Sequence, residues 1–118
     1  MEKNLEKPII VEGNHDVAAL RSIGFKGEII KLNDGNRIDD FCMKISSMYR
    51  EVILLTDFDR KGKDLKKRLE TTLLYDGCLV DTYLWRSITG FSLKSVEDIP
   101  YFYSTLKENL EGKNRKMI

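Results

Sequence analysis

Two aspartates follow directly on a short apolar run near the middle of the chain. Val52 to Leu55 is that run, and Asp57 and Asp59 come just after it. An unbroken apolar run of this length is typical of a buried parallel strand. Because side chains alternate along an extended chain, we expect both carboxylates to project to the same side. Two close carboxylates repel unless a proton, a base or a cation lies between them, and Mg²⁺ accepts one or two protein carboxylates.

The same aspartates also have a purely structural interpretation. Aspartates are common turn residues and helix N-caps, so Asp59 could simply cap a helix that starts near Arg60. That helix would begin strongly basic, because Lys or Arg occupies positions 60, 61, 63, 66, 67 and 68 and only Asp64 opposes them. Acidic residues that could bind a metal ion are therefore followed directly by basic residues that could bind a phosphate.

Length and composition predict one globular domain over residues 1–118. Hydrophobic residues make up 42% of the chain and charged residues 33%, with a net charge of +1, so a polyanion would meet local basic patches. Cys42 and Cys78 are too far apart for a paired metal-binding motif, and two isolated thiols suggest a reducing cytoplasm. The first eight residues lack the apolar core of a signal peptide, and no apolar run is long enough to span a bilayer. We expect a cytoplasmic protein without membrane contact.

The first half of the chain predicts two strand and helix pairs. Residues 8–13 form an expected strand with Glu12 at its end, and Asn14 is expected to cap a helix that runs to about residue 23. Residues 27–32 form an expected second strand. A second helix follows, in which four apolar residues at helical spacing are expected in the core: Ile38, Phe41, Ile45 and Met48.

The second half continues the alternation. After the strand at 52–55, Leu65, Leu69 and Leu73 form the apolar stripe of an amphipathic helix. Residues 79–85 are expected to form a fourth strand, with Arg86 at its end as a candidate phosphate ligand. The stretch 95–98 resembles a helix-capping sequence, and a C-terminal helix is expected over about 98–111.

Alternating strands and helices predict an α/β fold. We expect a four-stranded, mostly parallel, doubly wound Rossmann-like sheet in the order 2-1-3-4, with helices on both faces. In this order strands one and three are neighbours, and the crevice between their carboxyl ends is the usual ligand site. Glu12 ends strand one, while Asp57 and Asp59 follow strand three, so three carboxylates are expected to converge there.

These acidic motifs resemble those of the Toprim domain. The stretch Val11 to Asp16, followed by Leu54 to Gly62, is similar to the domain shared by type IA and type II topoisomerases, bacterial-type primases, OLD-family nucleases and ribosomal-RNA maturation nucleases. The resemblance covers roughly residues 8–86. The chain is most similar to small stand-alone Toprim proteins, which include archaeal members.

The resemblance implies roles for individual residues. Glu12 matches the glutamate assigned to general acid or base work, and with Asp57 and Asp59 it forms the expected ligand set for Mg²⁺, or alternatively Mn²⁺. Gly13 and Gly62 match the turn glycines of the two motifs. Asp16 matches a frequent additional acid, although as a first-turn helix residue it has a strong structural interpretation as a dipole partner. The expected phosphate ligands are basic residues beside these motifs: Arg60, Lys61, Lys63 and Arg86.

Three functions remain open from the sequence. The first is a Mg²⁺-dependent nuclease or RNA-processing enzyme acting on phosphodiester bonds of RNA or DNA. The second is a non-catalytic nucleic-acid-binding module that acts with a partner protein, in a primase-like or topoisomerase-like role. The third is a receiver-like or phosphatase-like domain phosphorylated on Asp57. Tyr101 and Tyr103 are poor candidates for a topoisomerase nucleophile, and whether a homodimer completes the site stays open.

Overall fold

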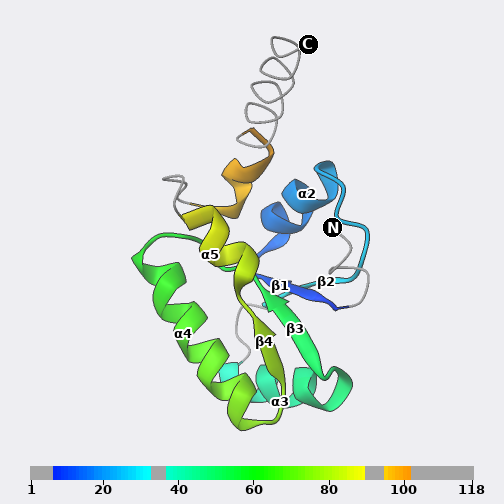
Figure 1. The fold of residues 1–118 in the computed structure, drawn as a ribbon, viewed down its shortest axis with the longest axis vertical. Helices are drawn as coiled ribbons and strands as arrows, with labels where there is room; N and C mark the ends of the chain where they lie inside the picture. The colour runs from blue at the N-terminus through cyan, green and yellow to red at the C-terminus, as the bar shows by residue number, and fades with distance from the viewer. Residues whose placement is uncertain (1–6, 33–36, 90–94, 102–118) are drawn as a thin grey trace, which may run out of the picture.

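The computed structural model describes residues 7–32, 37–89 and 95–101. Within them, four strands form one sheet in the order β2-β1-β3-β4 (Figure 1). The strands are β1 (Ile9–Val11), β2 (Ile29–Lys31), β3 (Glu51–Leu54) and β4 (Leu79–Asp81). Every neighbouring pair is parallel. The predicted order 2-1-3-4 is confirmed.

Helices follow the strands and cover both faces of the sheet, as predicted. They are α2 (Asn14–Ser22), α3 (Ile38–Met48), α4 (Arg60–Tyr75), α5 (Tyr83–Thr89) and a 3₁₀ turn, η1 (Val96–Asp98). Residues of α2, α5 and η1 pack on one face. Residues of α3 and α4 pack on the other. No helix in the described part of the chain is long and apolar enough to cross a membrane.

Two apolar clusters, one on each face, hold these layers together. Alternate strand residues point to opposite faces, so β1 and β3 contribute to both. The α2 face takes Ile9, Val11, Ile53 and Leu55 from the two central strands. The opposite face takes Ile10, Val52 and Leu54, together with the stripe on α4 that the sequence predicted: Leu65, Leu69 and Leu73. Near-complete burial of the central strands explains why their sequences are continuously apolar.

The prediction of a fourth strand over 79–85 is wrong in its second half. The strand ends at Asp81, and residues 83–89 form α5. The Asp81 side chain ends the strand, because its Oδ1 accepts a hydrogen bond of 2.9 Å from the backbone N–H of Tyr83. Apolar residues of α5, including Leu84 and Ile88, then pack at helical spacing against the core. Arg86 therefore lies on an exposed helix position and not at the end of a strand.

Two smaller predictions in the helices are also wrong. Met48 was expected in the core, but it is 58% exposed in the last turn of α3. There it lines a groove between α3 and the edge strand β2. Gly13, and not Asn14, occupies the N-cap position of α2. Asn14 instead accepts a hydrogen bond of 2.6 Å from Lys31 Nζ of the neighbouring strand.

The described part of the C-terminal segment agrees with the predicted capping sequence. The backbone N–H of Ser95 donates to Asp98 Oδ2 at 3.3 Å, and the Asp98 N–H donates to the Ser95 carbonyl at 3.1 Å. Residues 99–101 continue as helix. The rest of the expected helix, residues 102–111, lies outside the described residues.

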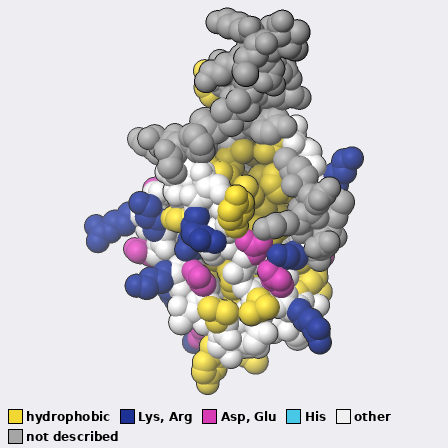
Figure 2. Space-filling view, in the orientation of Figure 1, with side chains coloured by type: hydrophobic (Ala, Val, Ile, Leu, Met, Phe, Trp, Pro, Cys, Tyr) yellow, Lys and Arg dark blue, Asp and Glu magenta, His cyan; other side chains and the backbone are white. Residues whose placement is uncertain are grey.

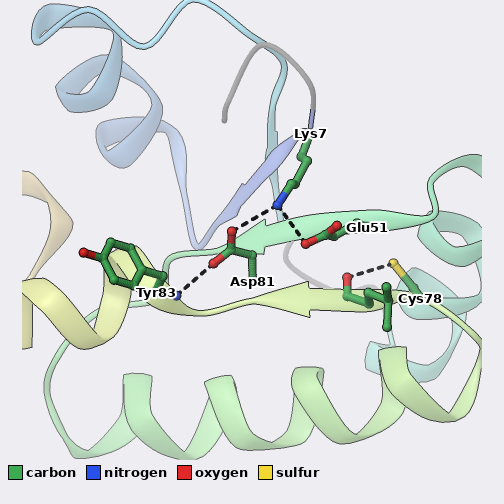
Figure 3. Close-up of polar contacts among 6 residues, drawn as sticks. Lys7, Glu51, Cys78, Asp81 and Tyr83 are labelled. Carbon is green, nitrogen blue, oxygen red and sulfur yellow. Dashed lines mark hydrogen bonds and ion pairs between the residues drawn. The ribbon is translucent and has the colours of Figure 1, made fainter. Parts of the chain in front are cut away.

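Opposite charges meet at the amino-terminal ends of the central strands. Lys7 Nζ lies 2.7 Å from Glu51 Oε2 and 3.1 Å from Asp81 Oδ2 (Figure 3). The three side chains are 18%, 35% and 11% exposed. The hydrogen bond to Glu51 is the main cause of a raised Lys7 pKa, which keeps the ammonium charged. Lys7 thus joins the start of β1 to strands β3 and β4.

Both cysteines are buried in the apolar cluster under α3 and α4. Cys42 and Cys78 are free thiols with no exposed surface. Burial raises the pKa of Cys42 to about 11 and also raises the pKa of Cys78. Neutral, enclosed thiols of this kind act as small apolar side chains and are chemically inert.

Candidate functional site

Glu12 connects the carboxyl ends of the two central strands. It follows β1 directly, and its half-buried carboxylate turns toward the loop after β3. There Glu12 Oε2 accepts a hydrogen bond of 2.6 Å from the backbone N–H of Asp57. The two acidic motifs, 45 residues apart in the sequence, therefore meet at the topological switch point of the sheet, where ligands of this architecture bind.

The loop that carries Asp57 is held in place from several sides. Thr56 is fully buried, and its Oγ1 donates to the Gly62 carbonyl at 2.8 Å. Trp85 Nε1 donates to the Thr56 carbonyl at 3.0 Å. Lys66 Nζ lies 4.7 Å from the centre of the Trp85 ring, a cation–π contact that brings α4 and α5 together. Gly62 packs its Cα against the Asp57 backbone so closely that no side chain fits.

Asp57 and Asp59 each accept a hydrogen bond from a different backbone group. Regular strand ends at Leu54, so the two aspartates lie in a loop. Asp57 Oδ1 accepts a hydrogen bond of 2.8 Å from the backbone N–H of Val96. Asp59 is exposed, and its Oδ1 accepts one of 2.7 Å from the Gly62 N–H at the start of α4. Asp59 therefore has the helix-capping role that was its structural alternative.

Asp16 is close enough to Glu12 and Asp57 for its charge to interact with theirs. It is 5% exposed, and its Oδ2 accepts a hydrogen bond of 3.0 Å from the Gly13 N–H. Burial raises the pKa of Asp16, and the negative charges of Asp57 and Glu97 raise it further, against the lowering effect of the Gly13 N–H. Asp16 thus both caps α2 and adds negative potential to the site.

The pKa of Glu12 is raised in the same way. Burial is the largest cause, and it outweighs the lowering effect of the hydrogen bond from the Asp57 N–H. The Asp57 carboxylate raises the Glu12 pKa both by its charge and by a hydrogen bond to it, and the charge of Asp16 adds to this. Because the ionisation of Glu12 and Asp16 is disfavoured, a proton or a cation would stabilise this site.

The carboxylates fit a magnesium ion in chemistry but are not arranged as a three-ligand cage. Among residues 7–32, 37–89 and 95–101, no group of three His, Cys, Asp or Glu side chains is placed to hold a metal ion. Mg²⁺ needs hard oxygen ligands and is usually bound by one or two carboxylates with water in the remaining positions. Glu12 and Asp57 meet that requirement as a pair.

The first turn of α4, which follows the acidic loop directly, carries basic side chains. Arg60, Lys61 and Lys63, the predicted phosphate ligands, are exposed in the first turn of the helix. Figure 2 shows Lys and Arg side chains gathered along the side of the molecule where α4 lies. A shallow groove of about 500 Å³ runs there, lined by Arg60, Lys61, Asp64, Leu65 and Arg68. Arg68 is a groove residue that motif matching did not single out.

Two contacts near the site could not have been predicted from the sequence. The Val96 N–H is a backbone group, so residue type does not reveal it. The contact between His15 Nδ1 and Glu97 Oε1, at 3.6 Å, joins exposed side chains of α2 and η1, and only the fold brings them together. Trp85 could have been suspected, because a lone tryptophan near a strand end usually finds a partner for its N–H.

Comparison with known proteins agrees with this geometry. The Toprim domain profile matches residues 7–82, which contain both acidic motifs. The chain belongs to the Toprim domain family. This Toprim chain is also 50% identical over 99 residues to a UPF0292 protein of Thermoplasma volcanium, with 83% of each chain covered. It is 39% identical over 102 residues to a UPF0292 protein of Pyrococcus abyssi, covering 86% of this chain and 76% of the relative.

A solved structure shares the fold. A protein from Aquifex aeolicus aligns with a TM-score of 0.71 at 25% identity, covering 83% of this Toprim chain and 93% of the other. Family membership supports a role associated with nucleic acid in which a metal ion takes part. The relatives' names do not state a reaction.

Proposed function

We propose that this Toprim domain is a Mg²⁺-dependent nuclease of the RNA-processing kind, acting on phosphodiester bonds. The observation that carries the proposal is the contact between Glu12 and Asp57 at the switch point, next to the basic first turn of α4. The residues that follow β1 and β3 supply carboxylates for a metal ion, and the first turn of α4 supplies positive charges for a phosphate. Both are needed for phosphodiester chemistry.

The roles follow from position and charge. Glu12 and Asp57 would hold Mg²⁺ or Mn²⁺, which when bound stabilises charge on the transferring phosphate. Glu12 would also handle the proton when it is not bound to the metal, the state in which burial and Asp57 raise its pKa. Arg60, Lys61 and Lys63 would orient the phosphate backbone, and Arg86 would contact a neighbouring phosphate.

A cleavage assay tests the proposal. The protein is incubated with structured RNA, single-stranded DNA and double-stranded DNA, each with Mg²⁺, with Mn²⁺ and with EDTA. We expect metal-dependent cleavage that falls at least about 100-fold in Glu12→Gln and Asp57→Asn. Asp39→Asn is the matched control, because Asp39 is an exposed aspartate of α3, which packs on the opposite face of the sheet. Absence of turnover on every substrate would contradict a nuclease.

One observation favours a second function. Asp59 is turned to cap α4, and no three-ligand cage stands ready among the described residues. A non-catalytic module that binds nucleic acid and acts with a partner protein needs the basic face of α4 but no complete metal centre. Nucleic-acid binding that survives the triple change Glu12→Ala, Asp57→Ala and Asp59→Ala, without turnover by the wild type, would support this module in place of the nuclease.

A further inference from the structure

We propose that the segment 95–99 supports the metal site from outside, with the backbone N–H of Val96 as a positioning group for the Asp57 carboxylate. This segment lies beyond residues 7–82, the stretch that the Toprim profile matches. In Figure 1 it is drawn in orange beside α2. The inference rests on the proposed function, since it assumes that Asp57 binds a metal ion.

The contact itself is direct. Val96 N lies 2.8 Å from Asp57 Oδ1, a short hydrogen bond between residues 39 positions apart in the chain. Hydrogen bonds from an N–H to an ionised carboxylate are among the stronger ones in proteins. With Oδ1 committed to Val96, the carboxylate is fixed in orientation beside Glu12, whose Oε2 is bonded to the backbone N–H of the same aspartate.

The segment is built into the core, so its N–H has a defined position. Val96 is fully buried and Ile99 is 5% exposed. Both belong to the apolar cluster on the α2 face of the sheet, with Leu20, Leu55 and Phe58 among its members. The hydrogen bonds between Ser95 and Asp98 shape the turn. A contact anchored in this way can hold a carboxylate in one rotamer.

A consequence for metal binding follows. Carboxylates that bind metals are themselves held by hydrogen bonds, and loss of such a partner typically lowers metal affinity by about 10- to 100-fold. We therefore expect Val96 to affect metal affinity without touching the metal. By thermodynamic linkage, a bound metal must in turn stabilise the docked segment by the same factor.

Val96→Pro removes the N–H at a position that suits proline. Val96 is the first residue of η1, a position where proline is well tolerated. Ser95 before it has φ −139° and ψ 161°, the extended conformation that a residue preceding proline prefers. Val96→Ala is the matched control, because it shortens the buried side chain but keeps the N–H.

Calorimetric titration with Mn²⁺ alone gives the first readout. We expect Val96→Pro to bind Mn²⁺ at least about tenfold more weakly than Val96→Ala, and Val96→Ala to bind within about threefold of the wild type. Equal affinities of the two variants would overturn the inference while leaving the proposed function intact. A wild type that binds no Mn²⁺ would refute both.

Hydrogen exchange on the wild type gives a second readout that needs no variant. Saturating Mg²⁺ should slow exchange of the Val96 amide by about tenfold or more. The Ile45 amide, in α3 on the opposite face, reports any general stabilisation. If Mg²⁺ binds but slows the Val96 amide no more than the Ile45 amide, the segment does not position the metal ligand.

Discussion

A methyl carbon added at Gly62 would lie 2.0 Å from the carbonyl oxygen of Asp57. The next nearest atoms, at 2.5 and 2.9 Å, also belong to the Asp57 backbone, so no flexible side chain can move aside. Gly62 therefore allows the first turn of α4 to approach the loop that carries the candidate metal ligand. The other motif glycine differs, because a methyl group at Gly13 would meet no atom within 4 Å.

We predict that alanine lowers the free energy of unfolding much more at Gly62 than at Gly13. Gly62→Ala should lower the free energy of unfolding by about 2–3 kcal/mol, because either α4 or the loop has to move. Gly13 has an extended φ of −155°, which any residue can adopt, so Gly13→Ala should cost at most about 1 kcal/mol, from the preference of the N-cap position for glycine over alanine. Urea unfolding of both variants measures this. A Gly62→Ala variant as stable as Gly13→Ala would contradict the packing.

Asp59 can be assigned as a helix cap or as a metal ligand with two substitutions. Asp59→Asn keeps an oxygen to accept from the Gly62 N–H and should leave stability within about 0.5 kcal/mol of the wild type. Asp59→Ala loses that acceptor and should cost about 1 kcal/mol. If Asp59 is a cap alone, both variants keep wild-type Mn²⁺ affinity by calorimetry. A similar loss of affinity in both would make Asp59 a ligand as well.

The central part of the fold could be predicted from the sequence because its signals are local. Continuous apolar runs indicated the positions of β1 and β3. The alternation of strands and helices then indicated a parallel sheet with only a few possible strand orders. The order in turn brought Glu12 next to Asp57, a contact now seen as a hydrogen bond of 2.6 Å. These strands could be predicted because a strand that is buried on both faces has a continuously apolar sequence.

The remaining features depend on contacts that the sequence does not display. Leu79 to Trp85 is apolar enough for either a strand or a helix, and the capping hydrogen bond from Tyr83 to Asp81 decides for a helix from residue 83. Asp59 suits a cap and a ligand equally well as a residue type. Val96 acts through its backbone, so its role could be found only from coordinates.

Lys7 should stabilise the sheet by neutralising two partly buried acids. In Lys7→Ala the carboxylates of Glu51 and Asp81 would face each other without the ammonium between them (Figure 3). We expect a loss of about 1–3 kcal/mol in the free energy of unfolding, between the values for exposed and for fully buried pairs. Adding Asp81→Asn should recover part of it. Lys26→Ala, at an exposed position, is the control, and an equal effect there would contradict this role.

The raised pKa of Glu12 predicts how stability depends on pH in the absence of divalent metal. The folded state holds the Glu12 proton more tightly than the unfolded chain, whose carboxyl has a pKa near 4.5. Stability from this group is therefore fully present below about pH 4.5 and is lost as pH rises through the higher folded value. Glu12→Gln cannot lose a proton, so its stability should fall less than that of the wild type between about pH 4.5 and pH 7.

Urea unfolding in EDTA at a series of pH values measures this difference. Under the proposed function, saturating Mg²⁺ should reduce the difference, because the cation neutralises the carboxylate that burial and Asp57 disfavour. Parallel pH profiles for the wild type and Glu12→Gln in EDTA would show that Glu12 ionises as easily in the folded protein as in the unfolded chain. In that case Glu12 would not have the environment of a proton-transferring acid, and the catalytic role proposed for it would lose its physical basis.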